Sequence, residues 1–146
     1  MKLVYADEKW CLGCHLCEYN CAFANSGLSD MAKALKGKTI HPRIHVEEKG
    51  QITYAVSCRH CEDPLCVKSC ISGALSKQDG VIRIDKNKCI GCLTCILVCP
   101  YGALSQSENG VAQKCELCLE NSCGTPACVA GCPNNALIYE ERGEIK

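Results

Sequence analysis

Four groups of cysteines spread along the chain constrain its fold more than any other feature of the sequence. The protein has 146 residues, 17 of which are cysteines, and all but Cys123 fall into these groups. Short gaps separate most members of a group, which is typical of metal-binding motifs. The groups are Cys11, Cys14, Cys17 and Cys21; Cys58, Cys61, Cys66 and Cys70; Cys89, Cys92, Cys95 and Cys99; and Cys115, Cys118, Cys128 and Cys132.

Large apolar side chains are scarce in the rest of the chain, which has one Trp, one Phe and five Tyr. Small proteins with so little core material are usually stabilised by disulfides or by metal. The cysteine count is odd, so a complete disulfide framework would leave one thiol over. Residues 1–9 hold no apolar run of signal-peptide length and no twin arginine, which predicts a cytoplasmic protein with reduced thiols. We therefore expect metal, and not disulfides, to stabilise the fold.

Charge and motif content exclude several other functions. The 16 basic and 16 acidic residues give a formal net charge of zero, so there is no basic field to attract nucleic acid. No stretch approaches the roughly 18 apolar residues of a membrane span. Neither a G-x-G-x-x-G nor a Walker motif is present, and no nucleophile or base stands beside the cysteines. We expect no nucleic-acid partner, no direct membrane insertion and no catalytic site.

The spacing of the first and third groups is that of the bacterial ferredoxin run, C-x₂-C-x₂-C-x₃-C, and Pro100 follows the third group. In such a run, three cysteines on a tight loop hold three irons of one [4Fe–4S] cluster. The fourth is expected at the start of a helical turn that faces away, where it ligates the neighbouring cluster. These motifs work in pairs, so four groups predict two pairs and four [4Fe–4S] clusters.

Structural zinc is the main alternative, because C-x₂-C pairs also suit a tetrahedral Zn²⁺ ion. Two such pairs already complete a zinc site, which leaves no reason for the further cysteines that close every group. The pattern favours iron–sulfur clusters, and a zinc-binding structural module remains the less favoured hypothesis.

Between the cysteine groups the predicted elements are short. Residues 80–85 and 52–56 alternate and are β-branched, which indicates strands, and residues 43–47 could pair with 52–56 as a hairpin. A short helix is predicted over 30–35, with Asp30 or Ser29 as its cap. A small residue followed by Ala and Leu recurs after three of the groups, which indicates duplication of one ferredoxin-like unit; these segments are 73–75, 102–104 and 135–137.

Three segments together resemble a known family. These are Cys58–Cys66 (CRHCEDPLC), the ferredoxin-type third group, and Lys114–Cys118 (KCELC). The combination is similar to the four-cluster iron–sulfur subunits of molybdopterin oxidoreductases and their relatives, which include subunits of formate dehydrogenases, hydrogenases and carbon monoxide dehydrogenases. The resemblance extends over nearly the whole chain and is closest to the soluble proteins associated with carbon monoxide dehydrogenase.

The resemblance, and not the spacing, implies a nested pairing in which the first group pairs with the fourth and the second with the third. The implied ligand sets are Cys11, Cys14, Cys17 and Cys132 for cluster 1; Cys21, Cys115, Cys118 and Cys128 for cluster 2; Cys58, Cys61, Cys66 and Cys99 for cluster 3; and Cys70, Cys89, Cys92 and Cys95 for cluster 4.

The predicted fold class is α+β, with two ferredoxin-like units in a pseudo-symmetric arrangement, each holding a pair of clusters. The chain is expected to form a single polyferredoxin domain over 1–146. One half would come from about 1–30 and 108–140, and the other from about 50–105.

Cys123 is the cysteine outside the groups. Four residues separate it from Cys118, as in the middle gap of the second group, so it could compete with Cys128 as a ligand. Cys128 is preferred because its spacing to Cys132, which Pro133 follows, matches the closing half of the other groups. A free buried thiol is the expected role of Cys123.

Five other residues beside the cysteines carry an expectation. His60 could replace a ligand, but four cysteines are already available, so packing or a hydrogen bond near the cluster is favoured. Trp10 could shield a cluster from water, although plain packing is favoured. Arg59, Lys88 and Lys114 could offset cluster charge, and exposure to solvent is their default expectation.

The predicted function is the relay of single electrons through four clusters by a subunit that is not itself an enzyme. It would act between an acceptor and a catalytic redox subunit, such as a carbon monoxide dehydrogenase, a formate dehydrogenase, a hydrogenase or a flavin-dependent oxidoreductase. A free-diffusing polyferredoxin is the second hypothesis.

Overall fold

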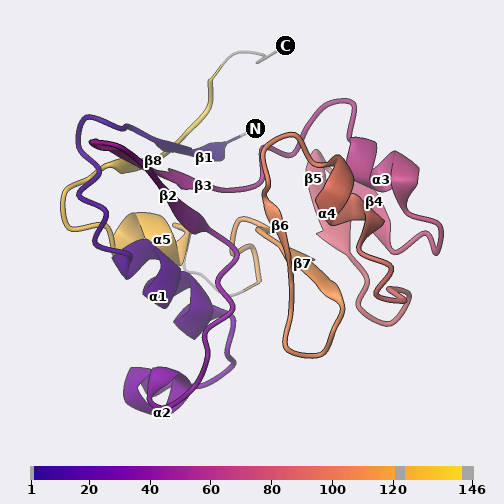
Figure 1. Cartoon of the computed structure of the whole chain (residues 1–146), viewed down its shortest axis with the longest axis horizontal. Coiled ribbons are helices and arrows are strands. Elements are labelled where there is room, and N and C mark those ends of the chain that lie inside the picture. Colours follow the sequence, from indigo (N-terminus) through magenta and orange to yellow (C-terminus); the bar gives the residue numbers. More distant parts are fainter. Residues whose placement is uncertain (1, 121–123, 143–146) are drawn as a thin grey trace.

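The structure, a computed structural model, describes residues 2–120 and 124–142. In these residues five short helices and eight short strands alternate, which confirms the α+β class. Figure 1 shows the elements in two groups, one with α1, α2, α5 and the strands β1, β2, β3 and β8, and the other with α3, α4 and β4 to β7.

The helices are α1 (Leu16–Ala24), α2 (Met31–Leu35), α3 (Leu65–Ser69), α4 (Thr94–Val98) and α5 (Ala127–Ala130). The strands are β1 (Leu3–Ala6), β2 (His45–Lys49), β3 (Ile52–Val56), β4 (Leu75–Gln78), β5 (Val81–Ile84), β6 (Leu104–Gln106), β7 (Ala112–Lys114) and β8 (Leu137–Glu140). They pair as four separate two-stranded antiparallel sheets, β1–β8, β2–β3, β4–β5 and β6–β7.

The elements predicted between the cysteine groups are confirmed. The hairpin pairs β2 with β3 from His45 opposite Val56 to Lys49 opposite Ile52. The alternating segment 80–85 contains β5. Asp30 caps α2, because its carboxylate accepts a hydrogen bond of 2.9 Å from the backbone N–H of Ala32.

The repeated small-Ala-Leu segments each lead into a strand. The leucine of each repeat begins β4, β6 or β8, and both the alanine and the leucine are buried. The alanine and the leucine thus anchor the start of each strand in the protein interior, close to the cysteine loops. The buried pairs are Ala74 and Leu75, Ala103 and Leu104, and Ala136 and Leu137.

The fourth cysteine of each group does not begin a helical turn, and this expectation was wrong. The third cysteine lies inside a helix in every group, and the fourth follows it by four residues. Cys21 lies inside α1, Cys70 and Cys99 directly follow α3 and α4, and Cys132 lies two residues after α5. Residues four apart lie on one face of a helix, so one short helix presents both thiols on the same side. Each helix begins before its third cysteine. His15 and Leu93 precede α1 and α4 in the left-handed backbone conformation, and Pro64 and Pro126 precede α3 and α5 with the restricted φ of proline.

Two hydrophobic clusters form the core, and both contain cysteines. One lies among α1, α5, β1, β3 and β8 and includes Val81 of β5, and the other lies among α3, α4 and β4 to β7. Helix α1 packs against α5, and α3 packs against α4. Cys17, Cys21 and Cys128 belong to the first cluster, and Cys66 and Cys95 to the second. The thiols are thus part of the core itself.

Across the two described ranges, the helices are all too short or too polar to cross a membrane.

Candidate iron–sulfur centres

Cysteines from distant parts of the chain line common hollows. Cys132 lines one hollow with Cys11, Cys14 and Cys17. Cys70 lines another with Cys89, Cys92 and Cys95, and Cys21 lines a third with Cys115 and Cys118. The structure thus brings the first group to the fourth and the second to the third.

Electrostatic contacts complete the groupings. Cys128 interacts with Cys21, Cys115 and Cys118, which places it with the third hollow, and also with Cys17. Cys66 interacts with Cys58 and Cys99, and Cys58 interacts with Cys61. Cys58 also interacts with Cys115, so the last two groupings are neighbours.

These contacts divide the sixteen described cysteines into four sets of neighbours. We call two of them the outer sites, Cys11, Cys14, Cys17 and Cys132, and Cys70, Cys89, Cys92 and Cys95. The two between them are the inner sites, Cys21, Cys115, Cys118 and Cys128, and Cys58, Cys61, Cys66 and Cys99.

The outer and inner sites differ in exposure to solvent. Each outer site has one exposed cysteine, Cys14 or Cys92, and one buried cysteine. Each inner site has two buried cysteines and none that is exposed. The inner sites therefore lie deeper in the protein.

Several buried thiols at these sites resist ionisation when no metal is bound. Burial raises the pKa of Cys17 and Cys115 to about 12, and that of Cys66 to about 11. Iron binds the thiolate, so its positive charge has to stabilise a form that burial disfavours. Metal binding and folding are therefore coupled at these sites.

The cysteines surround hollows and do not converge on a point. Over the part of the chain that the structure describes, no three or more His, Cys, Asp or Glu side chains are close enough to hold a single metal ion. Four thiolates around a hollow are the donor set of a cubane, which places several irons and sulfides between its ligands. The sixteen described cysteines fit four [4Fe–4S] clusters.

All four loops use the same backbone turn before their second cysteine. The residue there has a positive φ in every case, 66° at Gly13, 48° at His60, 75° at Gly91 and 60° at Leu117. Glycine adopts this conformation without strain, whereas His and Leu pay a steric cost. The outer loops thus have glycine, and the inner loops have large side chains that are both buried.

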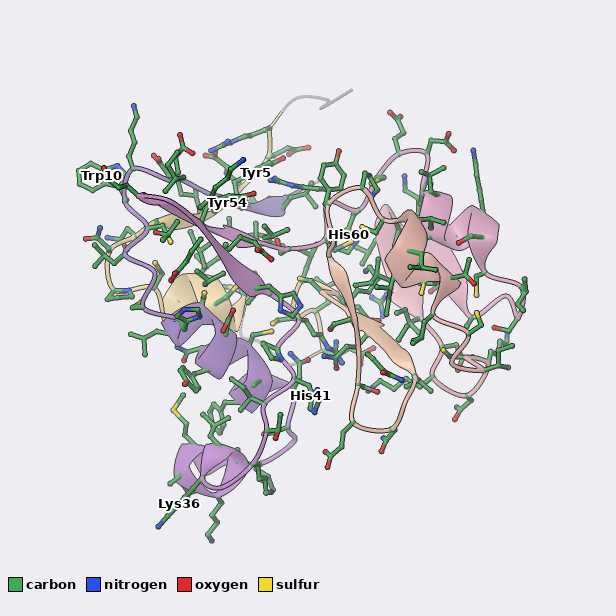
Figure 2. The ribbon with its side chains drawn as sticks, viewed as in Figure 1. Tyr5, Trp10, Lys36, His41, Tyr54 and His60 are labelled. Carbon is green, nitrogen blue, oxygen red and sulfur yellow. The ribbon has the colours of Figure 1, made fainter. Side chains whose placement is uncertain are left out.

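His60 is held in the interior, 4% exposed, and does not replace a cysteine. Its Nδ1 accepts a hydrogen bond of 3.0 Å from the backbone N–H of Ile82, and the backbone N–H of His60 donates to the Cys58 sulfur at 3.4 Å. Burial lowers the pKa of His60 to about 3, so the ring is neutral near pH 7. The expected packing role near the cysteines agrees with this geometry. Figure 2 shows His60 between the two groups of elements and Trp10 at the outer edge.

The edge of β5 that faces away from β4 is bound by side chains from the second and fourth cysteine groups. Ile82 donates its N–H to His60 and accepts from Lys114 Nζ through its C=O. The N–H of Ile84 donates to Glu116 Oε1 at 3.1 Å. Backbone N–H and C=O groups on the open edge of β5 thereby gain hydrogen-bond partners. The same hydrogen bonds link the second and the fourth cysteine groups to this strand.

Lys114 was expected in solvent, and the structure contradicts this, because its side chain is 1% exposed. Lys88, which stands in the same place before the third group, is exposed as predicted. Arg59 is half-buried with its guanidinium 5.6 Å from the centre of the Tyr5 ring, so it is not freely solvated. The sequence around the two lysines gave no signal that separates them.

Trp10, for which plain packing was favoured, has a side chain that is 57% exposed. It lines the hollow of the outer site with Cys11 and Cys14, where its ring can limit access of water. Cys123, expected as a free buried thiol, lies outside the described residues.

Known proteins are similar to this chain in sequence. Residues 50–142 match the family model described as a 4Fe-4S dicluster domain. HydN of Escherichia coli K12, named an electron transport protein, is 35% identical over 161 residues, covering 99% of this chain and 91% of HydN. PhsB of Salmonella typhi, named a thiosulfate reductase electron transfer subunit, is 34% identical over 142 residues, covering 91% of this chain and 72% of PhsB.

A longer relative contains the same region as one part. UacF of Escherichia coli K12 is 39% identical over 143 residues, which cover 97% of this chain but 22% of UacF. The family match extends over more than half of the chain, and HydN matches almost end to end. The chain belongs to the 4Fe-4S dicluster domain family.

Proposed function

We propose that the protein is an electron-transfer subunit that passes single electrons through four [4Fe–4S] clusters between a catalytic redox subunit and an acceptor. Electron transfer is the role in the names of HydN and PhsB, and PhsB is named as a subunit of a reductase. The chain would contribute no catalytic residue of its own.

The proposed ligands are the four sets that line the outer and inner sites, so each cluster takes three cysteines from one group and one from its paired group. The two ferredoxin-like halves would each hold one outer and one inner cluster. Hollows that cysteines of paired groups share support three of these sets, and the electrostatic contacts of Cys66 with Cys58 and Cys99 support the fourth.

The observation that carries the proposal is the order of the sites. Exposed cysteines occur at both outer sites, and the buried inner sites lie between them. A protein that accepts electrons at one surface and delivers them at another needs this arrangement, because the outer clusters can approach a partner while the inner ones remain shielded. A single-electron carrier needs only one exposed cluster.

The partner is proposed only by class. A carbon monoxide dehydrogenase, a formate dehydrogenase, a hydrogenase or a flavin-dependent oxidoreductase each supplies or takes single electrons through its own redox centres. The match to about a fifth of UacF, which is named a putative oxidoreductase, supports a module that works beside other redox parts. We propose a cytoplasmic location, where the cysteines stay reduced until iron binds.

The test begins with anaerobic purification of the tagged protein from the cells that make it. A stoichiometric redox enzyme is expected to co-purify, and removing the protein should stop electron flow from that enzyme to its acceptor while the enzyme still reduces an artificial dye. Restoring the purified protein should restore the flow.

Two results separate the alternatives. A protein that purifies without a partner yet exchanges electrons with several enzymes would be a free-diffusing polyferredoxin. A colourless protein that contains zinc and lacks acid-labile sulfide would be a structural module, and it would contradict the proposal.

A further inference from the structure

Lys114 is a buried cation with no carboxylate partner among the described residues. It ends β7, directly before the first cysteine of the fourth group, and its side chain is 1% exposed. Its ammonium donates hydrogen bonds to the C=O of Ile82 and, at 2.6 Å, to the C=O of Cys115. None of the ion pairs in the described ranges involves it.

The side chain lies where the two inner sites meet. Cys115, an inner-site cysteine of the fourth group, follows Lys114 in the chain. On the other side, the ammonium interacts with Cys58 and Cys66, which belong to the second inner site. It offsets part of the rise that burial causes in the pKa of both Cys58 and Cys115.

A lysine in this position is costly unless negative charge stands near it. A buried ammonium loses its hydration, and two carbonyl dipoles compensate for only part of that loss. Clusters with four thiolate ligands carry net negative charge, and in a low-dielectric interior they attract the ammonium strongly. Lys88 provides the contrast, because it precedes the third group in the same way but remains in solvent.

We propose that Lys114 is a buried counter-cation shared by the two inner clusters, and that it raises the reduction potential of both. This inference rests on the proposed ligand sets. Reduction adds one electron to a cluster, and a fixed positive charge stabilises that extra negative charge. When an electron passes across the junction, one inner cluster is oxidised as the other is reduced, and the same ammonium faces the charge before and after the step.

The test measures reduction potentials of the intact, anaerobically loaded protein by redox titration followed by EPR. Lys114→Met removes the charge, and the potentials of two of the four clusters are expected to become more negative. Lys88→Met, the matched control, removes an exposed lysine at the equivalent place and should leave all four nearly unchanged. Lys114→Arg keeps the charge and should retain most of the wild-type potentials.

The outcomes are separable. Unshifted potentials in a fully loaded Lys114→Met protein would overturn the inference, as would equal shifts in Lys114→Arg and Lys114→Met. If Lys114→Met does not load, Lys114→Gln retains a hydrogen-bond donor without charge and gives the same comparison. Wild-type protein without four clusters would contradict the ligand assignment instead, whatever the potentials.

Discussion

The outer and inner sites have the same backbone turn, yet they differ in what surrounds the metal. At the outer sites the residue before the second cysteine is Gly13 or Gly91, and that second cysteine is exposed. At the inner sites it is His60 or Leu117, which are buried at the same positive φ. The motif thus fixes the loop, and the residue within it determines how far the site is closed to water.

This difference agrees with different roles for the outer and inner sites in electron transfer. Exposed sites at the two ends can exchange electrons with other proteins, and closed sites between them can hold a potential that solvent does not perturb. Burial of His60 and Leu117 in a conformation that costs free energy is explained if closure of the inner sites is needed.

The largest expected effect is that of iron removal. Both hydrophobic clusters contain cysteines, so protein without iron should lose most of its fold, measured as loss of far-ultraviolet circular dichroism. Under limited exposure to air the outer clusters should be lost first, because Cys14 and Cys92 are exposed. EPR should then show the inner clusters in a species with about half the iron. Loss of all clusters in one step, or of the inner clusters first, would contradict the proposed difference in exposure between outer and inner sites.

Replacement of single ligands should separate the sites next. Cys115→Ala should lose more than one cluster, because Cys115 lies beside Cys58, which belongs to the other inner site, so both inner sites should be disturbed. Cys92→Ala should lose at most one cluster, about four irons, and keep the fold. Iron and acid-labile sulfide per chain measure both, and equal losses in the two variants would contradict the depth assigned to the inner site.

Closure of the inner site can be weakened without touching a ligand. Leu117→Ala removes a buried side chain that is 3% exposed, and it should cost about 2–4 kcal/mol. Leu12→Ala, at an exposed leucine in an outer loop, should change stability by less than about 0.5 kcal/mol. The rate at which the visible cluster absorbance disappears on heating compares the two. A faster loss of absorbance in Leu12→Ala than in Leu117→Ala would contradict the proposed role of Leu117 in closing the inner site.

The smallest expected effect concerns the glycine of an outer loop. A Cβ on Gly91 would lie 3.0 Å from the carbonyl oxygen of Gly110, at a φ of 75°, so Gly91→Ala should cost about 1–3 kcal/mol. Gly73→Ala is the control, since its φ is 68° and nothing lies within 4 Å of the added Cβ. Thermal unfolding of loaded protein should show the larger loss at Gly91. Equal losses would mean that the backbone contact has no role.

Much of this organisation could be predicted from the sequence because it depends on local patterns. The β2–β3 hairpin, β5 and the capped helix α2 follow from alternation and capping within a few residues. The cysteine spacing predicted the four groups in the same way.

The remaining features depend on tertiary contacts. The local sequence does not distinguish Lys88 from Lys114, since each precedes a cysteine and only the strand β5 buries the second. Likewise, the positive φ of His60 and Leu117 is unfavourable for those residues in isolation and is retained because the fold encloses them. The position of the fourth cysteine, inside a helix or just after one, depends on where each helix begins and ends, which the spacing does not determine.

The most direct test of the central claim is the content of iron, zinc and acid-labile sulfide per chain in anaerobically purified protein, combined with EPR after reduction by dithionite. Four clusters predict about sixteen irons and sixteen sulfides, together with signals from reduced clusters that interact with their neighbours. Zinc without sulfide would contradict the account.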